Sequence, residues 1–363
     1  MTDLELPNKG RRQFLGGLLA AGVVPQVSWA DAGSPAFLSA AAKPDGSFVL
    51  CGMGEDLFIR FELPLPARGH AAAAHPSRPE AVAFARRPGT FAVVIDCVKG
   101  TQIAALTSPE GRHFYGHGAF SSDGRLLFTT ENDYELGRGR IGVWDTQNGY
   151  TRIDEWDSGG IGPHDIKRLP GTDILVVANG GIDTHPDTGR TKLNIATMAP
   201  NLTYVETGHV IDTVSLAPEW HKNSIRHLDV SEGGAVAFGM QWQGDGPAGF
   251  LIGTHSRDSA PEIMKADSQA MRNLENYIGS IAFSADGGHI AATSPHGGTL
   301  HVYDVLSSKL TNVLSLPDTC GISYANSGFV ATSGTGLVKR VLGNEPSFDR
   351  TYDMAWDNHL VRI

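Results

Sequence analysis

The chain has 363 residues, 41% of them hydrophobic, and a formal net charge of −10. This composition supplies a large core, and the negative charge argues against nucleic acid as a partner, because binding to phosphates needs a basic surface. The three cysteines are odd in number and their spacing fits no metal-binding knuckle, so we expect at most one disulfide.

Residues 1–30 have the pattern of an export signal. Arg11 and Arg12 precede an apolar, Gly/Ala-rich run, and 28–30 place small residues at a cleavage site. The pattern resembles a twin-arginine signal, which exports folded proteins, whereas an ordinary secretory signal with a chance arginine pair is the alternative. The run is too short for a stable transmembrane helix. We expect a periplasmic, monomeric protein in which 31–363 form one domain without a transmembrane segment.

An internal repeat predicts the fold class. Each copy reads as a short strand, a turn and a second short strand, as in 117–130 and 280–293. Most copies continue with a third strand that closes on Asp (92–96, 141–145, 300–304) and a fourth (103–107, 310–316). A short helix is expected only within 262–277. The seven copies begin at His70, His117, His164, His227, Ser280, Gly321 and His359.

The starts are 38 to 63 residues apart, a spacing typical of four-stranded blades of the WD40/YVTN-like kind. The last copy, from His359, supplies only an innermost strand, and strands over 37–43, 48–53 and 57–63 supply the other three. The sequence therefore predicts an all-β, seven-bladed β-propeller whose closing blade is shared by the N- and C-terminal segments. This closure removes exposed sheet edges.

Histidine is the first residue of five of the seven copies, although the whole chain holds only 14. The first strand of each blade lines the central channel, so His70, His117, His164, His227 and His359 are expected to form an arc at one mouth, with a gap at Ser280 and Gly321. Neutral imidazoles are good ligands for transition metals, and an open arc leaves a coordination position for water or substrate. Alternatively, each histidine bonds to neighbouring strands and channel water.

Polar loops are predicted over the same face, where they favour a ligand-binding site. The ligand-binding candidates are Arg86, Arg87, Glu131, Asp133, Tyr134, His185, Arg190, Arg226, Ser280 and Cys320.

The chain resembles a bacterial family of exported propeller proteins of unknown function. The resemblance lies in stretches across the mature chain, among them 68–70, 85–91, 114–117, 130–134, 162–164, 178–181, 224–227, 277–280 and 356–359. Genes of that family tend to lie beside those for imelysin-like, iron-regulated periplasmic proteins. The resemblance implies a periplasmic setting, a link to iron uptake and an imelysin-like partner, but no established reaction or ligands.

These observations lead to one expectation of function and two alternatives. We expect a periplasmic metal-binding propeller that is accessory to the acquisition of iron or a related metal, with iron or copper held by the five histidines. A small-molecule enzyme, similar to propeller lactonases or quinoprotein oxidoreductases, is the first alternative, so enzymatic activity stays open. A protein-interaction scaffold is the second.

Overall fold

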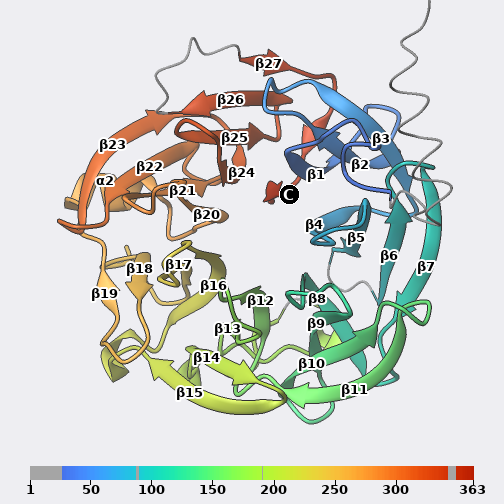
Figure 1. Ribbon diagram of the computed structural model, residues 1–363. Coiled ribbons are helices and arrows are strands. Elements are labelled where there is room, and N and C mark those ends of the chain that lie inside the picture. Colours follow the sequence, from blue (N-terminus) through green and yellow to red (C-terminus); the bar gives the residue numbers. More distant parts are fainter. Residues whose placement is uncertain (1–26, 87–89, 190, 342–348) are drawn as a thin grey trace, which may run out of the picture.

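Seven small β-sheets surround a central channel in the computed structural model (Figure 1). The structure describes residues 27–86, 90–189, 191–341 and 349–363, and the expected arginine pair of the signal lies outside them. Helix is nearly absent, as the repeat predicted. In the part of the chain that is described, no helix has the length and hydrophobicity that a membrane span requires.

Within each blade, antiparallel strands follow one another outward from the channel (Figure 1). Blade one consists of β4 (Gly69–Ala74), β5 (Glu80–Ala85), β6 (Phe91–Asp96) and β7 (Thr101–Thr107). Blade two consists of β8 (Arg112–Phe120), β9 (Leu126–Asp133), β10 (Arg138–Asp145) and β11 (Thr151–Asp157). Blade three consists of β12 (Pro163–Arg168), β13 (Leu175–Asn179), β14 (Asn201–Glu206) and β15 (His209–Ser215).

The remaining blades follow the same plan. Blade four consists of β16 (Asn223–Val230), β17 (Val236–Trp242), β18 (Ile252–His255) and β19 (Glu262–Ile263). Blade five consists of β20 (Ser280–Phe283), β21 (His289–Ser294), β22 (Thr299–Asp304) and β23 (Lys309–Ser315). Blade six consists of β24 (Thr319–Tyr324), β25 (Phe329–Ser333), β26 (Leu337–Val341) and β27 (Arg350–Thr351).

Blade seven joins the two ends of the described chain, as predicted. It consists of β1 (Phe37–Ala42), β2 (Phe48–Met53) and β3 (Ile59–Leu65), with β28 (Ala355–Trp356) and β29 (Val361–Arg362) on the channel side. Both C-terminal strands pair with β1, through Ala41–Trp356 and Leu38–Val361. The C-terminus accordingly lies near the centre of the ring (Figure 1).

Burial along the strands explains how the blades stack. The second strands are almost wholly buried, as in β13, because both faces pack against neighbouring blades. The outer strand β23 instead alternates exposed and half-buried residues with period two. Between blades five and six, Leu300 and Val302 pack in one core cluster with Phe329 and Ala331. The hydrophobic core therefore lies between the blades.

A short helix is found within 262–277, as expected, and it covers only part of that range. Glu262–Ile263 forms β19, the fourth strand of blade four, because β18 needs an antiparallel partner on its outer edge. The α-helix is only α2 (Ser268–Asn273), which Asp267 caps by accepting the backbone N–H groups of Gln269 and Ala270. Short 3₁₀ turns complete the helical content of the described chain: η1 (Pro186–Thr188), η2 (Ile195–Thr197) and η3 (Pro218–Trp220).

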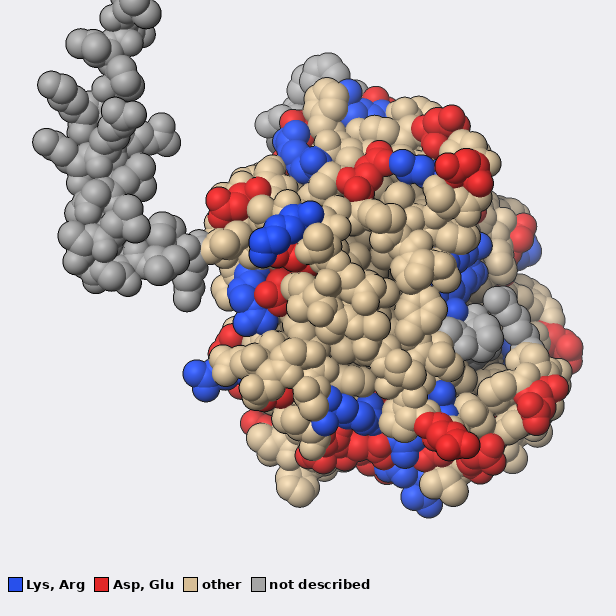
Figure 2. Space-filling view, turned by 90° about the vertical axis from the view of Figure 1, so that its right-hand side faces the viewer, with Lys and Arg blue, Asp and Glu red and all other residues tan. Residues whose placement is uncertain are grey.

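Side chains on the outer surface carry both signs of charge. In the side view of Figure 2, acidic and basic residues are interspersed around an area of uncharged residues. Acidic residues gather most along the lower edge of this view, where basic residues lie beside them.

Candidate functional site

The five predicted histidines converge in the channel. Neighbouring ring centroids lie 4.7 Å apart for His359 and His70, 5.0 Å for His70 and His117, 5.1 Å for His117 and His164, and 4.8 Å for His164 and His227. All five side chains are buried, with residue exposures between 2% and 9%. We call these five residues the histidine cluster.

The cluster is closed, and this corrects the expected arc with a gap. The rings of His227 and His359 lie 5.1 Å apart across the positions of blades five and six, and those of His117 and His359 lie 4.5 Å apart. Gly321 explains the closure, because a Cβ atom there would lie 2.6 Å from the backbone nitrogen of Leu360. The chain around His359 thus fills the space beside Gly321, and glycine is needed to let it pass.

Irregular pairing between the first and second strands of the blades sets the orientation of several imidazole rings. The register between the first and second strands shifts beside His70 in β4, His117 in β8, His164 in β12 and His227 in β16. In blade seven, the residues between β28 and β29, among them His359, fall outside both strand pairings. Since a β-bulge bends a strand and redirects its side chains, the repeated irregularity turns the imidazoles toward the channel axis.

Several ring nitrogens lack a hydrogen-bond partner. These buried atoms, taken within the described residues, are Nδ1 of His70, Nε2 of His117, Nδ1 of His164, both nitrogens of His227 and Nε2 of His359. A buried polar atom without a partner is costly and points to an ion, a ligand or ordered water in the native protein. The set therefore suits a transition metal, since imidazole nitrogens bind zinc, copper, iron and nickel.

Two groups of three histidines have ligand atoms within 4.8 Å of one another. One group is His70, His117 and His359, and the other is His117, His164 and His227. Two nitrogens on a tetrahedral ion lie about 3.4 Å apart at ordinary bond lengths, so modest ring movements would close either group around a metal. His117 belongs to both groups and is therefore the central ligand candidate.

An aspartate lies beside each of two rings of the cluster, and one of them is within hydrogen-bond distance. The Nδ1 atom of His117 lies 3.0 Å from Oδ1 of Asp165, whose carboxylate also accepts the backbone N–H of Leu228. The Nδ1 atom of His70 lies 3.8 Å from Oδ1 of Asp357. With its proton on Nδ1 toward Asp165, His117 presents the lone pair of Nε2 to the cluster.

Electrostatics keep most of the cluster neutral. Burial lowers the pKa of His70, and it holds the pKa values of His164, His227 and His359 well below the ordinary value. Burial would raise the pKa of Asp165, but the neighbouring His117 and Lys167 lower it below its usual range. Neutral imidazoles can bind a metal without first losing a proton.

Two cavities border the cluster, and their linings share no residue among those described. The loop-side cavity, of about 220 Å³, reaches His70 and His164 and is lined also by Arg86, Tyr115, Lys192, Arg226, Gln241 and Tyr277. The strand-side cavity, of about 130 Å³, reaches the other three histidines and is lined also by residues further along the inner strands, among them Asp165, Lys167 and Asp229. The histidine cluster therefore lies between two cavities with different linings.

The loop residues predicted to bind a ligand do not lie together but at several different sites. Arg86 and Arg226 line the loop-side cavity, whereas Ser280 lines the strand-side cavity. The rings of Tyr134 and His185 pack against each other, 5.0 Å apart, and line neither cavity. Arg87 and Arg190 lie outside the described residues.

The three thiols are all free and buried. The Cys320 thiol lies 3.1 Å from the carbonyl of Asp318, and burial raises its pKa to about 12. It lines neither channel cavity, so its contacts are those of a packed thiol.

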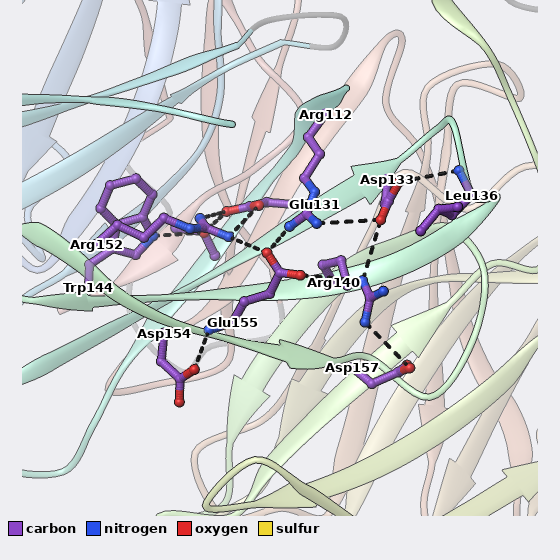
Figure 3. Close-up of polar contacts among 11 residues, drawn as sticks. Arg112, Glu131, Asp133, Leu136, Arg140, Trp144, Arg152, Asp154, Glu155 and Asp157 are labelled. Carbon is purple, nitrogen blue, oxygen red and sulfur yellow. Dashed lines mark hydrogen bonds and ion pairs between the residues drawn. The ribbon is translucent and has the colours of Figure 1, made fainter. Parts of the chain in front are cut away.

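Glu131 and Asp133 belong to an ionic network within blade two (Figure 3). The wholly buried Glu131 accepts hydrogen bonds of 2.5 and 3.1 Å from Arg152 and one of 3.0 Å from Thr129. Arg112 pairs with Glu155 and with Asp133, and Arg140 lies between Asp133 and Asp157. Neither carboxylate lines a channel cavity, so this network ties strands of the blade together.

Sequence reasoning did not single out Asp165, Asp357 or Tyr115 as site residues. Asp165 directly follows His164 and Asp357 precedes His359 by two residues, so proximity in the chain was a usable signal. No signal in the sequence pointed to the histidine that each aspartate contacts, because Asp165 contacts His117 of the previous blade and Asp357 contacts His70 of the next.

A family model described as "Protein of unknown function (DUF1513)" matches residues 63–363. No curated protein matches the chain. Among solved structures, a chain titled "Kuenenia stuttgartiensis Hydrazine Synthase" is similar, with a TM-score of 0.59, 11% identity, and coverage of 86% of this chain and 94% of that chain. At this identity the similarity supports the propeller fold alone.

Proposed function

We propose that this chain, which belongs to that family of unknown function, is a periplasmic metal-binding propeller accessory to metal acquisition, and that its histidine cluster holds iron or copper. The observation that carries the proposal is the convergence of five buried imidazoles, each with at least one ring nitrogen that lacks a hydrogen-bond partner among the described residues. A single buried histidine is more often a structural residue. Five such rings around one point are difficult to satisfy through hydrogen bonds alone, because four of them are kept neutral.

The ligand set would centre on His117. Its Nε2 would bind the ion while Asp165 holds its Nδ1, the usual way in which a carboxylate orients a ligating imidazole. His70 with His359, or His164 with His227, would complete three protein ligands. A bound iron or copper ion would supply one-electron redox chemistry, and the buried rings would limit its contact with solvent.

The cellular setting comes from the sequence. The expected twin-arginine signal would export the folded protein to the periplasm, with metal loaded before or after export. The resemblance to exported propellers encoded beside imelysin-like proteins supports a role in iron uptake and an imelysin-like partner. The export, the role in iron uptake and the imelysin-like partner can each be tested independently of metal binding.

Metal analysis of protein exported by its own signal is the decisive experiment. We expect stoichiometric iron or copper in the wild type, measured by mass spectrometry of the purified protein. His117→Ala should lose most of the metal because it removes the ligand common to both groups, and the combined His117→Ala and His164→Ala variant should lose nearly all of it.

A matched control is His301→Ala, since His301 is equally buried on β22 but lies outside the cluster. It should keep its metal. Wild-type protein without stoichiometric metal, or equal metal loss in the His117 and His301 variants, would refute the proposal. Two other results would favour the alternatives. A protein that binds no metal but shows a thermal shift with a small molecule would indicate an enzyme. A protein that co-purifies with a partner, and shows neither bound metal nor a thermal shift, would indicate a scaffold.

A further inference from the structure

The loop-side cavity has a strongly one-sided charge. Its described lining includes the cationic side chains of Arg86, Lys192 and Arg226 and no carboxylate. Three like charges around one small cavity repel one another unless an anion lies among them. The effect is visible in Lys192, whose pKa is lowered by burial and by the charge of Arg226.

Nearby acidic groups offset this charge only in part. Asp357 lies behind the cavity, where Nη1 of Arg86 is 3.8 Å from its Oδ1. The same carboxylate accepts a 2.7 Å hydrogen bond from Nε of Arg68, and Arg68 adds a further positive charge. Lys192 donates a hydrogen bond to Gln243, and Nε of Arg226 donates one of 2.9 Å to Ser224, among its contacts. Among the described residues that line the cavity, three carry positive charge and none carries a carboxylate.

Neutral polar groups complete the lining. Tyr115, Gln241, Tyr277 and Asn358 supply hydroxyl and amide groups around the same space. At about 220 Å³ the cavity has room for a polyatomic ligand, since one water needs roughly 10–15 Å³ of such volume. Arginine and lysine together with hydroxyl and amide donors are the groups that proteins use to bind carboxylates and phosphates.

The cavity also ends on the histidine cluster. His70 and His164 line it, both more than nine-tenths buried. The Nδ1 atom of His164 lacks a hydrogen-bond partner within the described residues, whereas Nδ1 of His70 lies 3.8 Å from Oδ1 of Asp357. A ligand in the cavity would therefore touch cationic side chains at one end and the two imidazoles, including the unpartnered nitrogen of His164, at the other.

We propose that the loop-side cavity binds a small polyatomic oxyanion, with carboxylate or phosphate oxygens, beside His70 and His164. Its oxygens face the guanidinium groups of Arg86 and Arg226 and the ammonium group of Lys192. The inference rests on the proposed function in one respect: where a metal is bound by the cluster, an oxygen of the anion is its additional ligand. The cargo would then be a metal together with a chelating anion.

Isothermal titration calorimetry with citrate and with inorganic phosphate tests the site, on exported protein both metal-loaded and stripped by a chelator. Arg226→Gln should weaken binding at least about tenfold, since it removes a charge from a partly buried site. Lys192→Gln, at the more exposed rim, should weaken it about threefold. The two probes distinguish a carboxylate site from a phosphate site, and binding of either supports the proposal.

Matched controls come from the strand-side cavity, which Lys167 and Arg362 line. Arg362→Gln and Lys167→Gln remove the same charges there and should leave anion binding within about twofold of the wild type. The proposal is overturned if neither anion binds in either metal state, or if the variants on the two sides weaken binding equally. If the metal proposal fails, only the measured metal content will show it, because anion binding to the metal-free protein does not depend on a bound metal.

Discussion

The Nδ1 atom of His117 lies 3.0 Å from Oδ1 of Asp165, a residue of the following blade. Oδ2 of the same carboxylate accepts the backbone N–H of Leu228, one blade further on. A single buried side chain thus links three consecutive blades and holds the central imidazole of the cluster.

Asp165→Asn should weaken metal binding about 10- to 100-fold, because the amide keeps the shape but loses the charge that orients His117. Competition with a chromophoric chelator measures the affinity. Asp229→Asn is the control, since Asp229 also accepts a backbone N–H from the next blade, that of Phe283, but forms no ion pair with a ring of the cluster within the described residues. Equal losses in the two variants would contradict an orienting role for Asp165.

Gly116→Ala should destabilise the protein and displace His70. Gly116 has φ of +98°, and a Cβ atom there would lie 2.6 Å from Cδ2 of the His70 ring. Gly149 has φ of +69° with nothing within 4 Å, so Gly149→Ala reports the backbone strain alone, about 1–2 kcal/mol. We expect the Gly116 variant to lose more free energy of unfolding in urea and to lose metal as well. Equal losses would mean that the ring does not depend on this glycine.

Glu131→Gln should cost about 1–3 kcal/mol in free energy of unfolding while the metal content stays unchanged. Glu131 is wholly buried and accepts hydrogen bonds from Arg152 and Thr129, and glutamine weakens these bonds although Arg152 keeps its ion pair with Glu155. Chemical denaturation together with metal analysis separates stability from binding. Asp154→Asn, on the exposed face of β11, should change stability by less than about 0.5 kcal/mol. Metal loss in a stable Glu131 variant would instead place this residue in the site.

Stability should fall with acidity in a way that His301 partly controls. Burial lowers the pKa of His301 from 6.5 to about 4, so the unfolded chain binds this proton first as the pH drops. The stabilisation from the neutral ring is complete above pH 6.5 and is lost progressively toward pH 4. Between about pH 7.5 and about pH 5 the loss from this residue is about 2 kcal/mol.

Urea denaturation across that pH range measures the slope. The His301→Gln variant should show a shallower pH dependence than the wild type, since glutamine does not titrate. Parallel slopes would show that His301 is not held neutral in the folded protein.

Much of the fold was accessible from sequence, for identifiable reasons. Each blade repeats a strand–turn–strand pattern, so seven copies reinforce one prediction, and the truncated copy at His359 required strands from 37–63 to complete it. The short helix expected within 262–277 is present as α2, but the sequence did not reveal β19, a two-residue strand in the same range that exists only through its pairing with β18.

The sequence by itself determined the propeller, the sharing of the last blade and the identity of the five channel histidines, because a repeat assigns equivalent residues to equivalent places. Tertiary structure decided how these rings meet. The backbone at Leu360 passes Gly321 and closes the expected gap, and Asp165 reaches a histidine of another blade. Tertiary structure also placed Glu131 in an ionic network and Arg226 at the wall of a cavity. Such contacts depend on the packing of one blade against the next, which no local pattern records.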